Sequence, residues 1–134
     1  MDQGPLVIEE IDAGAELIRE FNKYAPVSVA FWLKATDDDR RYLYIASDQI
    51  TDDNFDLAYG EVLRIVQNIT SVYIYLDPFR VKIVSTDDPL AQAALEINQR
   101  FPGRLATQYG GRFFGGMTVD GVYIYPPLSP AAVP

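Results

Sequence analysis

Apolar and polar residues alternate along residues 27–48, and this alternation is the clearest pattern in the chain. Because successive side chains of a β-strand point to opposite faces, the alternation predicts two strands joined by a short acidic loop. We expect Leu33 to lie opposite Leu43, which places Trp32 opposite Tyr44. The predicted core face then carries Val27, Val29, Phe31, Leu33, Leu43 and Ile45.

Three segments have apolar residues at three- and four-residue steps, the spacing that is typical of amphipathic helices. They cover residues 12–24, 51–68 and 89–101. An aspartate can cap the start of each helix, because a carboxylate accepts hydrogen bonds from the free backbone N–H groups there. The candidate caps are Asp12, Asp52 or Asp53, and Asp88.

Further strands are predicted from residues with a strong preference for extended backbone. Residues 79–85 alternate cleanly and predict a strand, residues 72–76 predict an extended segment, and residues 105–109 form a further candidate strand. The third helix is expected to end at residues 102–103, where Pro and Gly follow it.

The most typical two-residue turn in the chain is Asp120-Gly121. It predicts a second hairpin over residues 117–125. Side chains two residues apart share a face of a strand, so Tyr123 and Tyr125 are expected to point the same way.

The order of these elements predicts an α+β fold with one mostly antiparallel, mixed sheet of about five to six strands. Three helices would pack on one face of the sheet, because each helix has an apolar stripe to bury. With 134 residues the chain can bury one core, so residues 1–125 are expected to form a single domain. Residues 126–134 contain four prolines and are expected to be disordered or extended.

The composition narrows the possible chemistry. The sequence contains no cysteine and no histidine, which excludes thiol catalysis and imidazole-based mechanisms. Carboxylates, tyrosines and lysines remain for proton transfer, so an enzymatic activity is left open but not favoured. We predict no metal site, because the three Thr-Asp-Asp sequences fit helix caps or a solvated loop better than a calcium loop. We expect no cofactor either.

The net charge of −8 disfavours nucleic acids and anionic membrane surfaces as partners. No apolar run approaches the roughly 20 residues of a membrane span. The first residues show no basic region ahead of an apolar one, so a signal peptide is not expected and the cytoplasm is the expected location.

The second face of the predicted hairpin is the first candidate for binding. Large rings exposed on a monomer mark an interaction surface, and Trp and Tyr often dominate binding energies. The competing interpretation is that the ends of the chain, or a second core layer, cover this face. The candidate binding residues are Trp32, Tyr42, Tyr44, Tyr123 and Tyr125.

Residues 110–116 are the second candidate, because four glycines surround Arg112 there. Glycine backbone and an arginine can bind an anion, but the Lys-Ser/Thr pair of a phosphate loop is missing. A kinked strand start is the competing interpretation.

The leading functional hypothesis is a protein that acts by protein–protein contact, as a homodimer formed through the aromatic face or by binding another protein there. The alternative is a small-molecule-binding protein or an enzyme with a pocket near residues 110–116. In that pocket the polar contacts would come from Arg112, Tyr44 and Tyr123.

Overall fold

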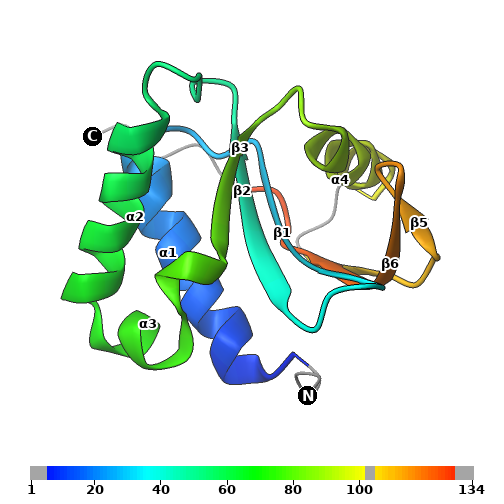
Figure 1. Ribbon diagram of the computed structural model, residues 1–134, viewed down its shortest axis with the longest axis horizontal. Helices are drawn as coiled ribbons and strands as arrows, with labels where there is room; N and C mark the ends of the chain where they lie inside the picture. Colours follow the sequence, from blue (N-terminus) through cyan, green and yellow to red (C-terminus); the bar gives the residue numbers. More distant parts are fainter. Residues whose placement is uncertain (1–5, 102–104, 129–134) are drawn as a thin grey trace.

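The computed structural model describes residues 6–101 and 105–128, which form one mixed six-stranded sheet flanked by helices (Figure 1). The strands are β1 (Val29–Ala35), β2 (Arg41–Ser47), β3 (Val81–Ser85), β4 (Thr107–Tyr109), β5 (Phe113–Phe114) and β6 (Met117–Ile124). Their order in the sheet is β3-β2-β1-β6-β4, and β5 pairs with β6. β2 and β3 run parallel, and the other pairs of described strands run antiparallel. The predicted α+β class and the mostly antiparallel, mixed sheet are therefore confirmed.

Helices cover both faces of this sheet. Three helices lie on one face, but they are not the three that the sequence predicted there: α1 (Ile8–Tyr24), α2 (Phe55–Asn68) and α3 (Thr70–Tyr75). The third of them is one that the sequence pattern did not predict. The helix that was predicted over residues 89–101 forms as α4 (Pro89–Arg100) and packs on the opposite face, together with β5.

Each face of the sheet has its own core. The core on the α1 side includes Leu17, Phe21 and Ile45, all fully buried. The core on the α4 side includes Phe31 and Ile124, which are also fully buried. Because both faces carry fully buried side chains, neither is a free surface of the sheet. Burying one such side chain stabilises a fold by about 1.5–3 kcal/mol.

The predicted register of the first hairpin is wrong by one residue. Trp32 pairs with Leu43, and Leu33 pairs with Tyr42. A shift of one residue moves every side chain of a strand to the other face, so Leu43 shares the face of Trp32. The sequence pattern could not detect this shift, because both faces are buried and neither needs to be polar.

The segment predicted as extended, residues 72–76, is the C-terminal part of α3 and its cap. Val72 and Leu76 stand four residues apart and are both buried on the α1 side. The Leu76 N–H donates to the Val72 carbonyl at 2.8 Å. Packing of this pair outweighs the strand preference of the residues between them.

The predicted hairpin turn at Asp120-Gly121 is also wrong, because β6 runs straight through it. The chain turns instead at Gly115 and Gly116, whose φ angles are +58° and +83°. A two-residue turn with two positive φ angles suits glycine best. The register between β1 and β6 shifts at Asp120, so the Asp-Gly pair sits at a bulge rather than a turn.

The structure confirms one of the predicted helix caps and differs at the other two helices. Asp88 caps α4, since its carboxylate accepts the Leu90 N–H at 2.8 Å. α1 begins at Ile8, ahead of Asp12, and Asn54 rather than Asp52 or Asp53 stands at the cap of α2. The predicted helix end at residues 102–103 and most of the tail, residues 129–134, lie outside the described residues. Among the described helices none is long and apolar enough to cross a membrane.

Candidate functional site

Three of the predicted binding residues form a closed network on the α1 side. The Trp32 Nε1–H donates to the Tyr125 hydroxyl at 2.9 Å, and this hydroxyl donates to the Ile11 carbonyl of α1 at 2.8 Å. The Tyr123 ring packs edge-on against Tyr125, with 5.2 Å between their centroids. Burial raises the pKa of Tyr125, which keeps its hydroxyl protonated. This network links the sheet to α1 and leaves Trp32 2% exposed.

Tyr42 and Tyr44 lie on the other face of the sheet. Tyr44 is buried and stacks on Phe31, with 5.1 Å between the ring centroids. The Lys82 ammonium lies 4.3 Å from the centroid of the Tyr42 ring, which is a cation–π contact. The single exposed aromatic face that was predicted is therefore not formed, because the register shift divides its rings between two cores.

The predicted pocket around Arg112 is not formed either. Tyr44 packs in the core on the α4 side and Tyr123 packs against the core on the α1 side. Arg112 is exposed, just ahead of β5, and its backbone carbonyl accepts the Val119 N–H at 2.8 Å. The sheet separates the two tyrosines, so these three side chains cannot contact one ligand together.

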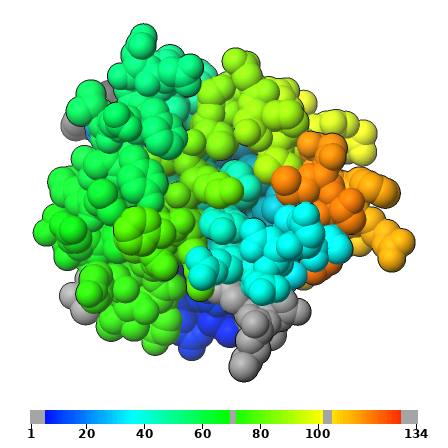
Figure 2. Space-filling view, in the orientation of Figure 1, coloured from blue at the N-terminus to red at the C-terminus, as the bar shows by residue number. Residues whose placement is uncertain are grey.

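Large apolar side chains are exposed instead on α3 and on the one-turn helix η1 (Pro78–Arg80). We call these four residues the α3–η1 surface: Tyr73, Ile74, Tyr75 and Phe79, which are 66%, 63%, 47% and 79% exposed. The green part at the left of Figure 2 is the side of the molecule that α2 and α3 form. The strand-like sequence of residues 72–76 hid this surface, because a strand would have buried alternate side chains.

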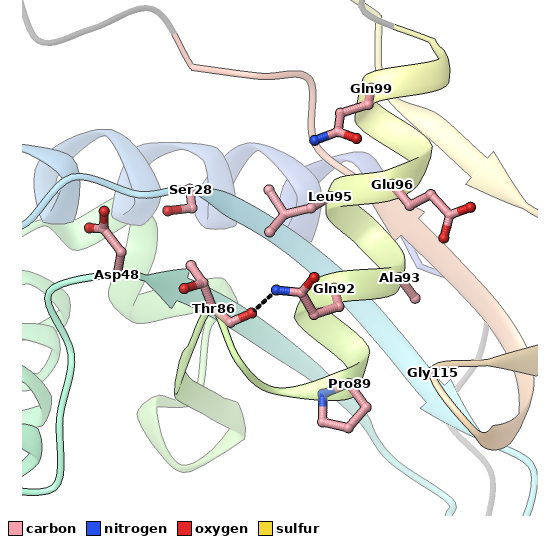
Figure 3. Close-up of a pocket in the computed structure, with 10 residues that line it drawn as sticks. All are labelled: Ser28, Asp48, Thr86, Pro89, Gln92, Ala93, Leu95, Glu96, Gln99 and Gly115. Atoms are coloured by element: carbon pink, nitrogen blue, oxygen red, sulfur yellow. Dashed lines mark hydrogen bonds between the residues drawn. The ribbon is translucent and has the colours of Figure 1, made fainter.

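A second feature is an open groove of about 920 Å³ between α4 and the strand ends, which we call the α4 groove (Figure 3). Its polar lining comes from segments far apart in the sequence. Ser28 precedes β1, Asp48 follows β2, and Thr86 follows β3. α4 adds Pro89, Gln92, Ala93, Leu95, Glu96 and Gln99, and the β5–β6 turn adds Gly115.

Hydrogen bonds position the walls of the α4 groove. The Gln92 Nε2–H donates to the Thr86 carbonyl, which joins α4 to the loop after β3. The Ser28 N–H donates to the Ala46 carbonyl at 2.8 Å, which holds Ser28 beside the end of β2. In Figure 3 the Leu95 side chain points from α4 toward Ser28, while Glu96 points away from Asp48.

A smaller hollow of about 430 Å³ lies beside the groove, between the loop after β2 and the end of β3. Its lining includes Ile50, Phe55 and Ile83, together with Asp52 and Asp87. Within the described residues, no group of three or more acidic side chains is placed to hold a metal ion.

Comparison of the chain with protein-family models, with curated proteins and with solved structures gives no match.

Proposed function

We propose that this protein acts by protein–protein contact and forms a homodimer through the α3–η1 surface. The observation that supports this proposal is the exposure of four large apolar side chains within seven residues of chain. Monomers seldom leave such a group in water, and larger apolar patches usually mark a contact with another protein. Tyr is also among the residue types that dominate binding energies.

The size of the surface suits the centre of an interface. From the exposed fractions of these four side chains, we estimate on the order of 500 Å² of exposed side-chain area. A stable interface buries about 800 Å² on each partner, with an apolar centre and a polar rim. The α3–η1 surface can supply that centre, and residues around it would complete the rim.

The charge of the chain favours this surface over others for contact between two copies. Each copy carries a net charge of −8, so two copies repel each other unless they meet where charge is low. Residues 70–79 contain one charged side chain, Asp77. A twofold symmetric dimer brings the same patch of each copy together, so an uncharged patch avoids like-charge contacts.

Buried contacts also fix the backbone of the α3–η1 surface. Val72 and Leu76 anchor α3 in the core, and the Tyr59 hydroxyl donates to the Pro78 carbonyl at 2.6 Å. Binding would therefore require little ordering of this segment, which lowers the cost of association.

We also propose that the dimer works in the cytoplasm. A sequence without cysteine needs no oxidising compartment to form disulfides, which is compatible with this location.

The test is the molar mass in solution, measured by light scattering over a range of protein concentrations. We expect a dimer for the wild type and a monomer for Ile74→Glu, because two buried carboxylates would meet across the twofold axis. Phe113→Glu is the matched control, since Phe113 is 68% exposed but lies on β5, on the α4 side of the sheet. A wild-type monomer, or a dimer that survives Ile74→Glu, would contradict the proposal.

A further inference from the structure

The parallel strands β2 and β3 are neighbours in the sheet, but the chain leaves them in opposite directions. After β2 it continues into α2 on the α1 side, and after β3 it continues into α4 on the other side. Figure 1 shows α2 and α4 on opposite sides of the two strands. Such diverging connections open a crevice at the carboxyl ends of parallel strands, which is where open α/β sheets bind ligands.

The α4 groove lies at this point. Asp48 directly follows β2 and Thr86 directly follows β3, and both line the groove. Its volume of about 920 Å³ falls within the roughly 300–1,000 Å³ that is typical of small-molecule sites. The divergence of the chain accounts for the hollow, and its place at the carboxyl ends of β2 and β3 is where such sheets bind ligands.

The charge of the groove indicates the sign of the ligand. Asp48 supplies the carboxylate of the groove, because Glu96 points away from it and pairs with Arg100 at 2.8 Å. No lysine or arginine is among the ten lining residues. The loops at residues 48–54 and 86–88 add further aspartates and no basic residue. An anionic ligand would meet repulsion here, whereas a cation is attracted by the site and by the net charge of −8.

The hydrogen-bonding groups and the apolar wall indicate an organic cation. An ammonium group donates hydrogen bonds, and the groove offers acceptors in the Asp48 carboxylate and in the Ser28 hydroxyl, whose oxygen points toward Asp48 in Figure 3. Gln92 uses its Nε2–H on the Thr86 carbonyl, so its amide oxygen remains as an acceptor. Leu95 points into the groove toward Ser28 and can contact a short carbon chain.

We propose that the α4 groove binds a small organic amine, with its ammonium group on Asp48 and its carbon chain along Leu95. The site is separate from the α3–η1 surface. It would make the protein a binder of small amines as well as a partner in protein–protein contact.

The test is a titration of ¹⁵N-labelled protein followed by amide NMR signals. Putrescine, agmatine and lysinamide are the probes, and butane-1,4-diol and succinate are the neutral and anionic counterparts of putrescine. We expect at least one amine to shift the amide signals of residues 48, 86, 92 and 99 in a saturable way. We expect the diol and succinate to leave them unchanged.

Variants of the groove then test the role of charge. Asp48→Asn is expected to weaken amine binding roughly tenfold or more, because a hydrogen bond to a charged group is lost. Asp37→Asn removes the same charge from the exposed β1–β2 loop and is the matched control, expected to bind as the wild type. Gln99→Lys should weaken binding and Gln99→Glu should strengthen it, and both changes lie on an exposed helix position.

The proposal fails if no amine gives saturable shifts, if the diol shifts the same signals, or if Asp48→Asn binds amines as well as Asp37→Asn does. Opposite effects of the two Gln99 variants support it even if Asp48→Asn alters the fold. Equal effects of Gln99→Lys and Gln99→Glu on the affinity for amines contradict the proposal. Ile74→Glu should leave amine binding unchanged, so the test of amine binding does not depend on whether the protein forms a dimer.

Discussion

On the α1 side of the sheet a ring hydroxyl bridges a strand and a helix, whereas on the α4 side a backbone turn rests directly on a helix. Tyr125 reaches from the end of β6 to the Ile11 carbonyl, and a Cβ atom on Gly14 would lie 2.3 Å from its hydroxyl oxygen. Gly115 approaches α4 so closely that a Cβ there would lie 2.8 Å from the Pro89 carbonyl oxygen.

The difference shows how one sheet can support two tasks. Three helices and a hydrogen-bonded ring pair cover the α1 side. A single twelve-residue helix covers the α4 side and leaves the α4 groove open beside it. Both faces carry a buried core, and the larger of the two hollows lies on the α4 side.

The largest expected effect comes from Gly115→Ala, which tests the close approach on the α4 side. We expect a loss of about 2–4 kcal/mol in the free energy of unfolding, from the positive φ angle and from the clash with α4. Gly116→Ala is the matched control, because Gly116 has a positive φ angle but no atom within 4 Å of the added Cβ. It should lose about 1 kcal/mol. Equal losses in urea unfolding would show that α4 does not rest on the turn.

A smaller loss is expected from Tyr125→Phe, which tests the hydrogen bonds on the α1 side. The Trp32 Nε1–H and the Ile11 carbonyl would each lose a partner, at a cost of about 1–3 kcal/mol. Tyr44→Phe is the control on the α4 side, because stacking of the Tyr44 ring on Phe31 does not need the hydroxyl. If both variants unfold at the same urea concentration, the hydroxyl network does not distinguish the two faces.

The smallest expected effect concerns the ion pair that spans the bulge between β1 and β6. The Lys34 ammonium donates to Asp120 at 2.7 Å, and this hydrogen bond lowers the pKa of Asp120. A carboxyl group with a lowered folded-state pKa stabilises the fold above its unfolded pKa and loses that contribution as pH falls through the folded value.

We therefore expect Asp120→Asn to reduce the drop in melting temperature that the wild type shows on acidification below about pH 4. Asp39→Asn, at an exposed position of the β1–β2 loop, should keep the full drop. An unchanged drop in Asp120→Asn would show that the bulge does not depend on this pair.

Helix positions with local signals were predictable from the sequence. α4 has an aspartate cap followed by proline, and each of these acts on its own backbone neighbours. α3 has no such signal, and its two buried residues become a helical pair only because α1 is there to receive them. The α3–η1 surface was missed for the same reason.

The α4 groove could not be predicted for a different reason. Ser28, Asp48, Thr86 and Gln99 are spread over most of the chain, and each looks like an ordinary loop or surface residue. They meet because β2 and β3 are parallel neighbours in the sheet, and no local sequence pattern predicts that pairing. The available signal was Asp48, an aspartate that directly follows a predicted strand.

The sequence by itself determined the α+β class, most helix and strand positions, the net charge of −8 and the histidine- and cysteine-based chemistry that is excluded. These features depend on residue type and on the spacing of residues a few positions apart. Such local preferences do not need contacts between distant parts of the chain. The tertiary structure alone decided the register of the first hairpin, the helical state of α3, and which rings are buried. Each of these depends on contacts between distant segments, where two arrangements satisfy the local pattern equally and packing selects one of them.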